Sequence, residues 1–79
     1  MSAKIQVFPM KGLDGVYVSA ALADTNRNIL PTYPTGTSIL IDQELNKRHC
    51  TEHKDVESVA MGILTGVGIF REEVEFIYR

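Results

Sequence analysis

The chain contains one cysteine, three prolines and no tryptophan. The single cysteine, Cys50, excludes a disulfide within the chain, so a reducing, cytoplasmic location is the simplest expectation. The first residues lack the long apolar stretch of a signal peptide. The uncharged stretch between Glu57 and Arg71 is shorter than the about 20 residues that cross a bilayer. The sequence therefore predicts a soluble, cytoplasmic protein that does not act on a membrane.

An excess of basic charge is also absent. Ten Asp and Glu residues oppose eight Lys and Arg residues, which gives a net charge of -2 spread along the chain. Nucleic-acid binding needs several clustered basic side chains to neutralise phosphates. Aromatic residues do not alternate with Lys or Arg as they do on RNA-stacking surfaces. We therefore expect no direct contact with nucleic acid.

Phosphate-binding loops and nucleophile elbows are missing as well. The densest set of reactive side chains is His49, Cys50 and His53, which could share a metal ion if they stood on one helix. Structural zinc sites usually draw four ligands from two separated pairs, and the chain offers no second pair. We expect no metal, no other cofactor, no catalytic residue and no enzymatic activity. A metal-dependent or thiol enzyme remains the least favoured alternative.

The length of 79 residues allows one domain, residues 1–79, with one core. Its clearest pattern begins at Asp55, where apolar residues recur at helical spacing, and changes after Gly66 and Gly68 to the alternation of a strand. Either glycine can end the helix in a left-handed conformation. The helical stripe consists of Val56, Val59, Ala60, Ile63, Leu64 and Val67, and the strand face consists of Val74, Phe76 and Tyr78.

The first half of the chain reads as strands joined by turns. Strands are predicted at residues 4–9 and 16–23, followed by a brief return strand at Ile29 and Leu30 that Pro31 limits.

Residues 38–41 form an ambiguous apolar run, which fits either a short strand or the start of a helix through Leu45. We favour the strand, because Asp42 is a good N-cap for a following turn that ends at Arg48.

The predicted fold class is α+β: a small antiparallel sheet of three to four strands, covered by one helix in the C-terminal half and followed by a final strand. One core is expected to contain Val59, Ile63, Leu64, Val74 and Phe76, with Tyr17 or Val18.

Two surface features are candidates for partner binding. Glu72, Glu73 and Glu75 place carboxylates close together at one end of a strand, where like charges repel unless a cation compensates them. Residues 32–38 form an uncharged loop with the Tyr, Ser, Thr and Gly composition of adaptable contact loops, and Tyr33 is its aromatic residue. These residues predict a surface for a protein partner with a basic patch.

Gly62 and Gly66 form a G-x-x-x-G motif within the predicted helix. Glycine inside a helix costs about 1 kcal/mol relative to alanine. Small residues at this spacing suit close packing of the helix on its sheet or contact with the helix of a second copy. A homodimer through Gly62 and Gly66 is therefore an open alternative.

A short, mildly acidic chain with one cysteine, an α+β pattern and no catalytic motif resembles the small inhibitory proteins of phages and mobile elements, including anti-CRISPRs. The resemblance concerns size, charge and layout. It implies a protein that blocks a larger complex by setting acidic side chains against a nucleic-acid-binding Lys or Arg patch. We therefore expect a non-enzymatic binding protein, with a homo-oligomeric structural or assembly subunit as the alternative.

Overall fold

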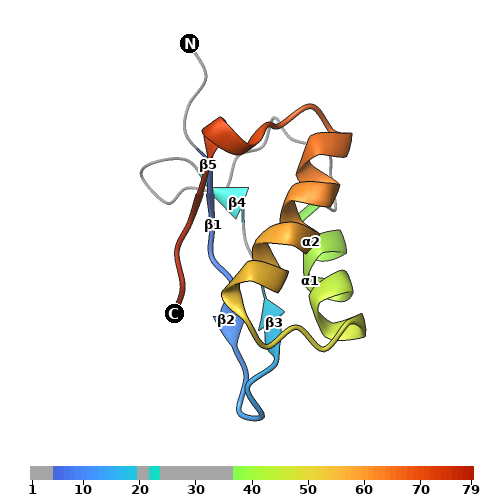
Figure 1. The fold of residues 1–79 in the computed structure, drawn as a ribbon, viewed down its shortest axis with the longest axis vertical. Helices are drawn as coiled ribbons and strands as arrows, with labels where there is room; N and C mark the ends of the chain where they lie inside the picture. Colours follow the sequence, from blue (N-terminus) through green and yellow to red (C-terminus); the bar gives the residue numbers. More distant parts are fainter. Residues whose placement is uncertain (1–4, 20–21, 24–36) are drawn as a thin grey trace.

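The computed structural model describes residues 5–19, 22–23 and 37–79. Within these residues, short strands form one layer and two helices form the other (Figure 1). The small α+β class is thus as predicted, but two helices cover the strands where one was expected. The return strand predicted at Ile29 and Leu30, and the loop residue Tyr33, lie outside the described residues.

The larger sheet has the order β4-β1-β5 and is mixed. Its central strand β1 (Ile5–Val7) pairs antiparallel with β4 (Leu22–Ala23) and parallel with β5 (Val74–Phe76). The expectation of a wholly antiparallel sheet is therefore wrong for the last strand. The helical layer returns the chain to the end of the sheet at which β1 begins, so β5 runs in the same direction as β1.

A second sheet is the hairpin of β2 (Met10–Lys11) and β3 (Tyr17–Ser19). Its turn is closed by a hydrogen bond from Gly12 N to Val16 O, 2.7 Å long, and Gly15 takes the positive φ of 85° that the reversal needs. Tyr17 is buried on this hairpin and Val18 is exposed, so Tyr17 supplies the core contact.

Residues 38–41 do not form a strand but belong to helix α1 (Thr37–Lys47), so the favoured prediction was wrong. Asp42 accordingly lies inside the helix and does not cap it. The buried residues Thr37, Ile41 and Leu45 are spaced four apart, which places them on one helical face. Packing of that face against β3 and the second helix outweighs the strand propensity of the run.

Helix α2 (His53–Gly66) follows the predicted stripe as far as Leu64. Val67, the last member of the stripe, lies just past the helix and is 39% exposed, so its placement on the buried face was wrong. Val56, Ala60 and Leu64 are fully buried, whereas Val59 and Ile63 lie half-buried at the edge of the core. The helix ends in a Schellman motif: Ile69 N donates to Leu64 O at 3.0 Å and Gly68 N to Thr65 O at 3.1 Å. Gly68, with φ of 86°, is thus the terminating glycine.

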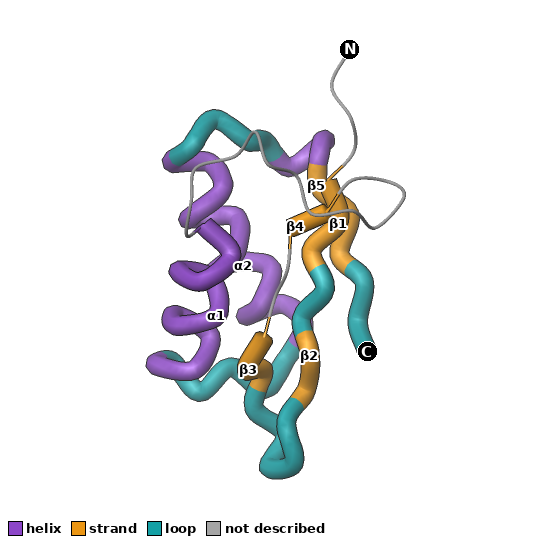
Figure 2. The backbone as a smooth tube through the Cα atoms, turned by 180° about the vertical axis from the view of Figure 1, so that it is seen from behind, coloured by secondary structure: helices purple, strands orange, loops and turns teal. Residues whose placement is uncertain are grey.

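The core lies between the two layers, and the helices cover the same side of the strands (Figure 2). Its buried members are Ile5, Val7, Tyr17, Leu22, Ile41, Leu45, Cys50, Val56, Ala60, Leu64, Ile69 and Val74. Phe76, Tyr78, Val59 and Ile63 pack against it as half-buried residues. Neither described helix has the length and apolar character that crossing a membrane requires.

Leu64→Ala should lower the free energy of unfolding by about 2 to 5 kcal/mol, because it opens a cavity at a fully buried position. Ile63→Ala, at the adjacent half-buried position, should cost only about 1 to 2 kcal/mol. Chemical denaturation of both variants measures the difference. Equal losses would show that both helix faces are buried to the same extent.

Candidate binding surface at the C-terminal strand

The carboxylate of Glu57, on α2, holds the C-terminal segment of the chain. The hydroxyl of Tyr78 donates a hydrogen bond of 2.7 Å to Glu57 Oε2, and Arg71 Nη2 lies 3.4 Å from Glu57 Oε1. One acidic side chain therefore joins a helix, the start of η1 (Arg71–Glu73) and Tyr78, which lies two positions beyond the end of β5 (Val74–Phe76).

Arg71, which stands beside the acidic residues in the chain, contacts Val74 and Phe76 as well as Glu57. Its Nη1 donates a hydrogen bond of 2.8 Å to the carbonyl of Val74, and its guanidinium carbon lies 5.2 Å from the centre of the Phe76 ring. A guanidinium over an aromatic ring gains cation–π attraction. The Val74 carbonyl accepts this hydrogen bond from Arg71, so it is not free to pair with a further strand at the edge of β5.

The predicted acidic residues line a surface hollow of about 470 Å³. Glu72 and Glu75 are exposed and Glu73 is half-buried. The hollow is lined by Glu57, Arg71, Glu72, Glu73, Val74, Glu75, Phe76 and Tyr78. The structure thus brings the three predicted carboxylates together at one hollow and adds Glu57 to them.

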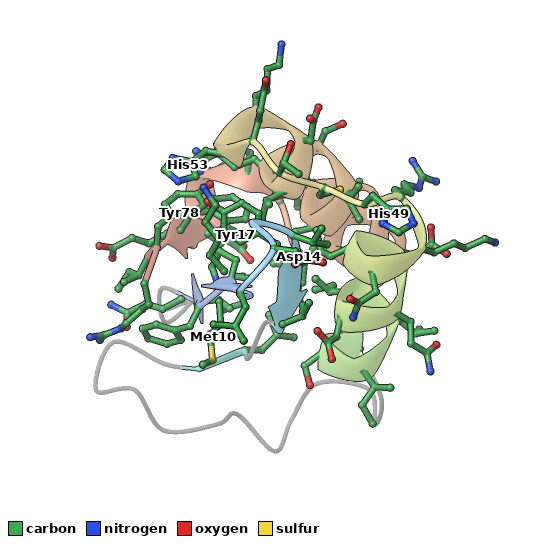
Figure 3. The ribbon with its side chains drawn as sticks, turned by 90° about the horizontal axis from the view of Figure 1, so that it is seen from below. Met10, Asp14, Tyr17, His49, His53 and Tyr78 are labelled. Atoms are coloured by element: carbon green, nitrogen blue, oxygen red, sulfur yellow. The ribbon has the colours of Figure 1, made fainter. Side chains whose placement is uncertain are left out.

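An aromatic cluster supports this surface from the side of α2. The ring of His53 stacks on Tyr78, with 3.7 Å between centroids and 20° between planes. Tyr17 meets Tyr78 edge-on at 6.0 Å. Figure 3 shows His53, Tyr78 and Tyr17 gathered on one side of the molecule. These contacts hold the Tyr78 ring in place, so its hydroxyl meets Glu57 in a defined position.

The three candidate metal ligands do not stand on one helix. His49 lies in the connection between the helices, while His53 begins α2, and Figure 3 shows their side chains on opposite sides of the molecule. Within the described ranges, no three His, Cys, Asp or Glu side chains are grouped so that they could hold a metal ion. Cys50 is buried, and burial together with the nearby Asp55 raises the pKa of its thiol. Its thiol is therefore protonated near neutral pH, which does not favour a nucleophilic role.

His49 has a structural role at this position: it ends α1. Its φ is 51°, Cys50 N donates to Leu45 O at 3.1 Å, and His49 N donates to Asn46 O at 3.2 Å. This is the same Schellman geometry that Gly68 provides for α2. A histidine occupies the left-handed position that glycine usually takes.

Gly62 and Gly66 lie on the exposed surface of α2. A Cβ atom added to either glycine would meet no atom within 4 Å. Close packing of the helix on the sheet therefore does not explain these glycines.

Glu57 and Arg71 line the hollow and pair with each other, and neither was predicted from the sequence as part of the site. Acidic residues are favoured near a helix N-terminus, and this local preference already accounts for Glu57 in the sequence. Its contacts with Tyr78 and Arg71 were therefore not expected. The only feature of the sequence that pointed to this site was Arg71, the one basic residue directly before Glu72 and Glu73. Comparison with protein-family models, with curated proteins and with solved structures finds no match for this chain.

Tyr78→Phe should lower the free energy of unfolding by about 1 kcal/mol at pH 7, because it removes the hydrogen bond to Glu57 and keeps the ring stacking. Burial, then the hydrogen bond to Glu57, raises the pKa of the Tyr78 hydroxyl. The stabilisation is therefore complete below the unfolded value of about 10 and is lost as pH rises above it. Denaturation from pH 7 to 11 should show the wild-type advantage shrinking above pH 10. A constant advantage would contradict this assignment.

His49→Gly should raise the free energy of unfolding by about 1 kcal/mol, because glycine adopts the left-handed conformation without the steric cost that a Cβ atom brings. Thermal unfolding of the variant measures the gain. His53→Gly is the control, and it should destabilise the chain because it removes the stacking on Tyr78 and places glycine in a helix. A loss of stability in His49→Gly would mean that the imidazole makes a necessary contact.

Proposed function

We propose that this chain is a small, non-enzymatic binding protein whose acidic surface engages a basic region of a larger protein partner. The acidic surface consists of Glu72, Glu73 and Glu75 at the hollow beside β5. The observation that supports this proposal is an excess of negative charge in the hollow. Arg71 is the basic residue among the lining residues, and Glu57 already pairs with it, so the other three carboxylates have no cation in the hollow.

Rigid support makes this imbalance suitable for recognition. Glu75 lies on β5 and Glu72 and Glu73 lie in η1, which the Arg71 contacts hold against the strand. Three like charges on a fixed frame repel one another, and a basic partner relieves that repulsion. Interface charges mainly set the association rate and the choice of partner.

The partner class that fits is a protein with a Lys and Arg patch, such as a subunit of a nucleic-acid-processing or defence complex. Carboxylates that occupy such a patch compete with the phosphates it normally binds. The protein would thereby act as an inhibitor, as anti-CRISPRs do. Tyr33, outside the described residues, is the proposed aromatic contribution from the uncharged loop.

The test begins with capture of the partner from the source cell by the tagged chain. Glu73→Lys with Glu75→Lys should keep the wild-type fold, but its association with that partner should slow by about tenfold or more and lose its dependence on salt. Stopped-flow or biosensor kinetics at several salt concentrations measure both effects. Unchanged kinetics in a stably folded double variant would reject the acidic surface as the site.

A matched control uses single variants. Glu75→Lys and Glu52→Lys make the same charge change at exposed residues that each have one weak polar contact, of 3.4 Å to Gln6 and 3.5 Å to Lys54. Only Glu75→Lys should slow association. The inhibitor role is tested separately, because a partner that still binds nucleic acid when saturated with this chain would reject inhibition while it leaves binding intact.

A further inference from the structure

A second hollow, which we call the helical groove, runs between α1 and α2 and has a volume of about 390 Å³. It is lined by Leu40, Glu44 and Arg48 from the first helix and its end, and by Ser58, Val59, Gly62 and Ile63 from the second. Figure 1 shows β5 on the side of the molecule away from the helices, so the groove and the acidic surface occupy different regions.

The walls of the helical groove are apolar. Leu40 is 53% exposed, and Val59 and Ile63 are only half-buried against the core. Contiguous apolar surface of this kind is uncommon on a monomer that has no partner, because covering it with another protein surface removes it from water.

Gly62 lies in this groove, with open space where a side chain would be. Glycine weakens a helix relative to alanine, and no contact within the described chain requires it here. A second backbone that approaches the groove would require it, because a Cβ atom would hold that backbone away.

The rim of the groove is self-complementary in charge. Glu44 and Arg48 lie one turn apart at the end of α1 and form an ion pair of 3.0 Å. In an interface with two-fold symmetry, every contact occurs twice, because each of the two chains contributes each of the two contacting residues. Glu44 of one chain then faces Arg48 of the other, and the reverse. A uniformly basic or uniformly acidic partner would meet a like charge at one of these two positions.

We propose that the helical groove is the interface of a homodimer with two-fold symmetry, in which Gly62 allows close approach of the helices and Glu44 of each chain faces Arg48 of the other. This proposal is independent of the acidic surface. The dimer leaves that surface open and presents it twice, which strengthens binding to a repeated or multi-subunit partner through effective concentration.

Charge exchange across the interface tests the proposal. By sedimentation velocity, the wild type should be a dimer at high concentration, and Glu44→Arg and Arg48→Glu should each dissociate at least about tenfold more readily, since their homodimers face like charges. An equimolar mixture of the two variants should form heterodimers and restore association. A wild type that stays monomeric, or a mixture that does not associate, would overturn the interface; circular dichroism of each variant checks the fold.

The glycine is tested with a matched pair of variants on the same helix. Gly62→Leu should dissociate the dimer without unfolding the chain, because open space surrounds the position in the monomer. Thr65→Leu places the same leucine side chain at an exposed position that does not line the groove, and it should leave the dimer intact. Equal effects of the two substitutions would show that surface hydrophobicity, and not the groove, controls association.

Discussion

The parallel pairing of β1 with β5 is the constraint on which the rest of the fold depends. It aligns Ile5 with Val74 and Val7 with Phe76, and the hydrogen bond from Ile77 N to Val7 O continues it by one residue. Strands so distant in sequence pair only after the intervening chain has folded back, which costs loop-closure entropy. The burial of all of β1 and of Val74 offsets that cost. The same pairing directs the chain beyond β5 along the second helix, where Tyr78 reaches Glu57.

The candidate binding surface follows from that arrangement. Glu57 lies on a helix, Arg71 begins a 3-10 turn and Tyr78 follows the last strand, yet one carboxylate contacts both of the others. Each contact is partly exposed, so its individual contribution to stability is modest. Their combined effect is to fix the frame that carries the acidic residues at the hollow. A rigid acidic frame is what recognition of a basic patch needs, because ordering flexible side chains on binding would reduce the affinity.

The two proposed surfaces have different chemistry and therefore suit different partners. The hollow at β5 has one sign of charge in excess and an aromatic wall, which favours a basic protein. The helical groove has apolar walls and one charge of each sign, which favours a copy of itself. His49 and Cys50, which lie between the two helices, line neither surface: His49 ends α1 with positive φ, and Cys50 belongs to the core. The density of His and Cys there reflects a helix terminus and its packing.

The sequence by itself determined the second helix, the side of it that packs on the core, and the strand that follows, because these follow from local spacing that only one secondary structure satisfies. It left open whether Gly66 or Gly68 ends the helix, and the structure assigns that role to Gly68. The same spacing brought Glu72, Glu73 and Glu75 together, since they are close in the chain. Residues 38–41 satisfied two local patterns, and only contact of Ile41 and Leu45 with the core decided for the helix. The direction of β5 and the meeting of Glu57, Arg71 and Tyr78 were likewise decided by the tertiary structure. The contacts of Glu57 join residues up to 21 positions apart, and the pairing of β1 with β5 joins residues 69 positions apart. No short-range periodicity encodes which distant partners the folded chain brings together.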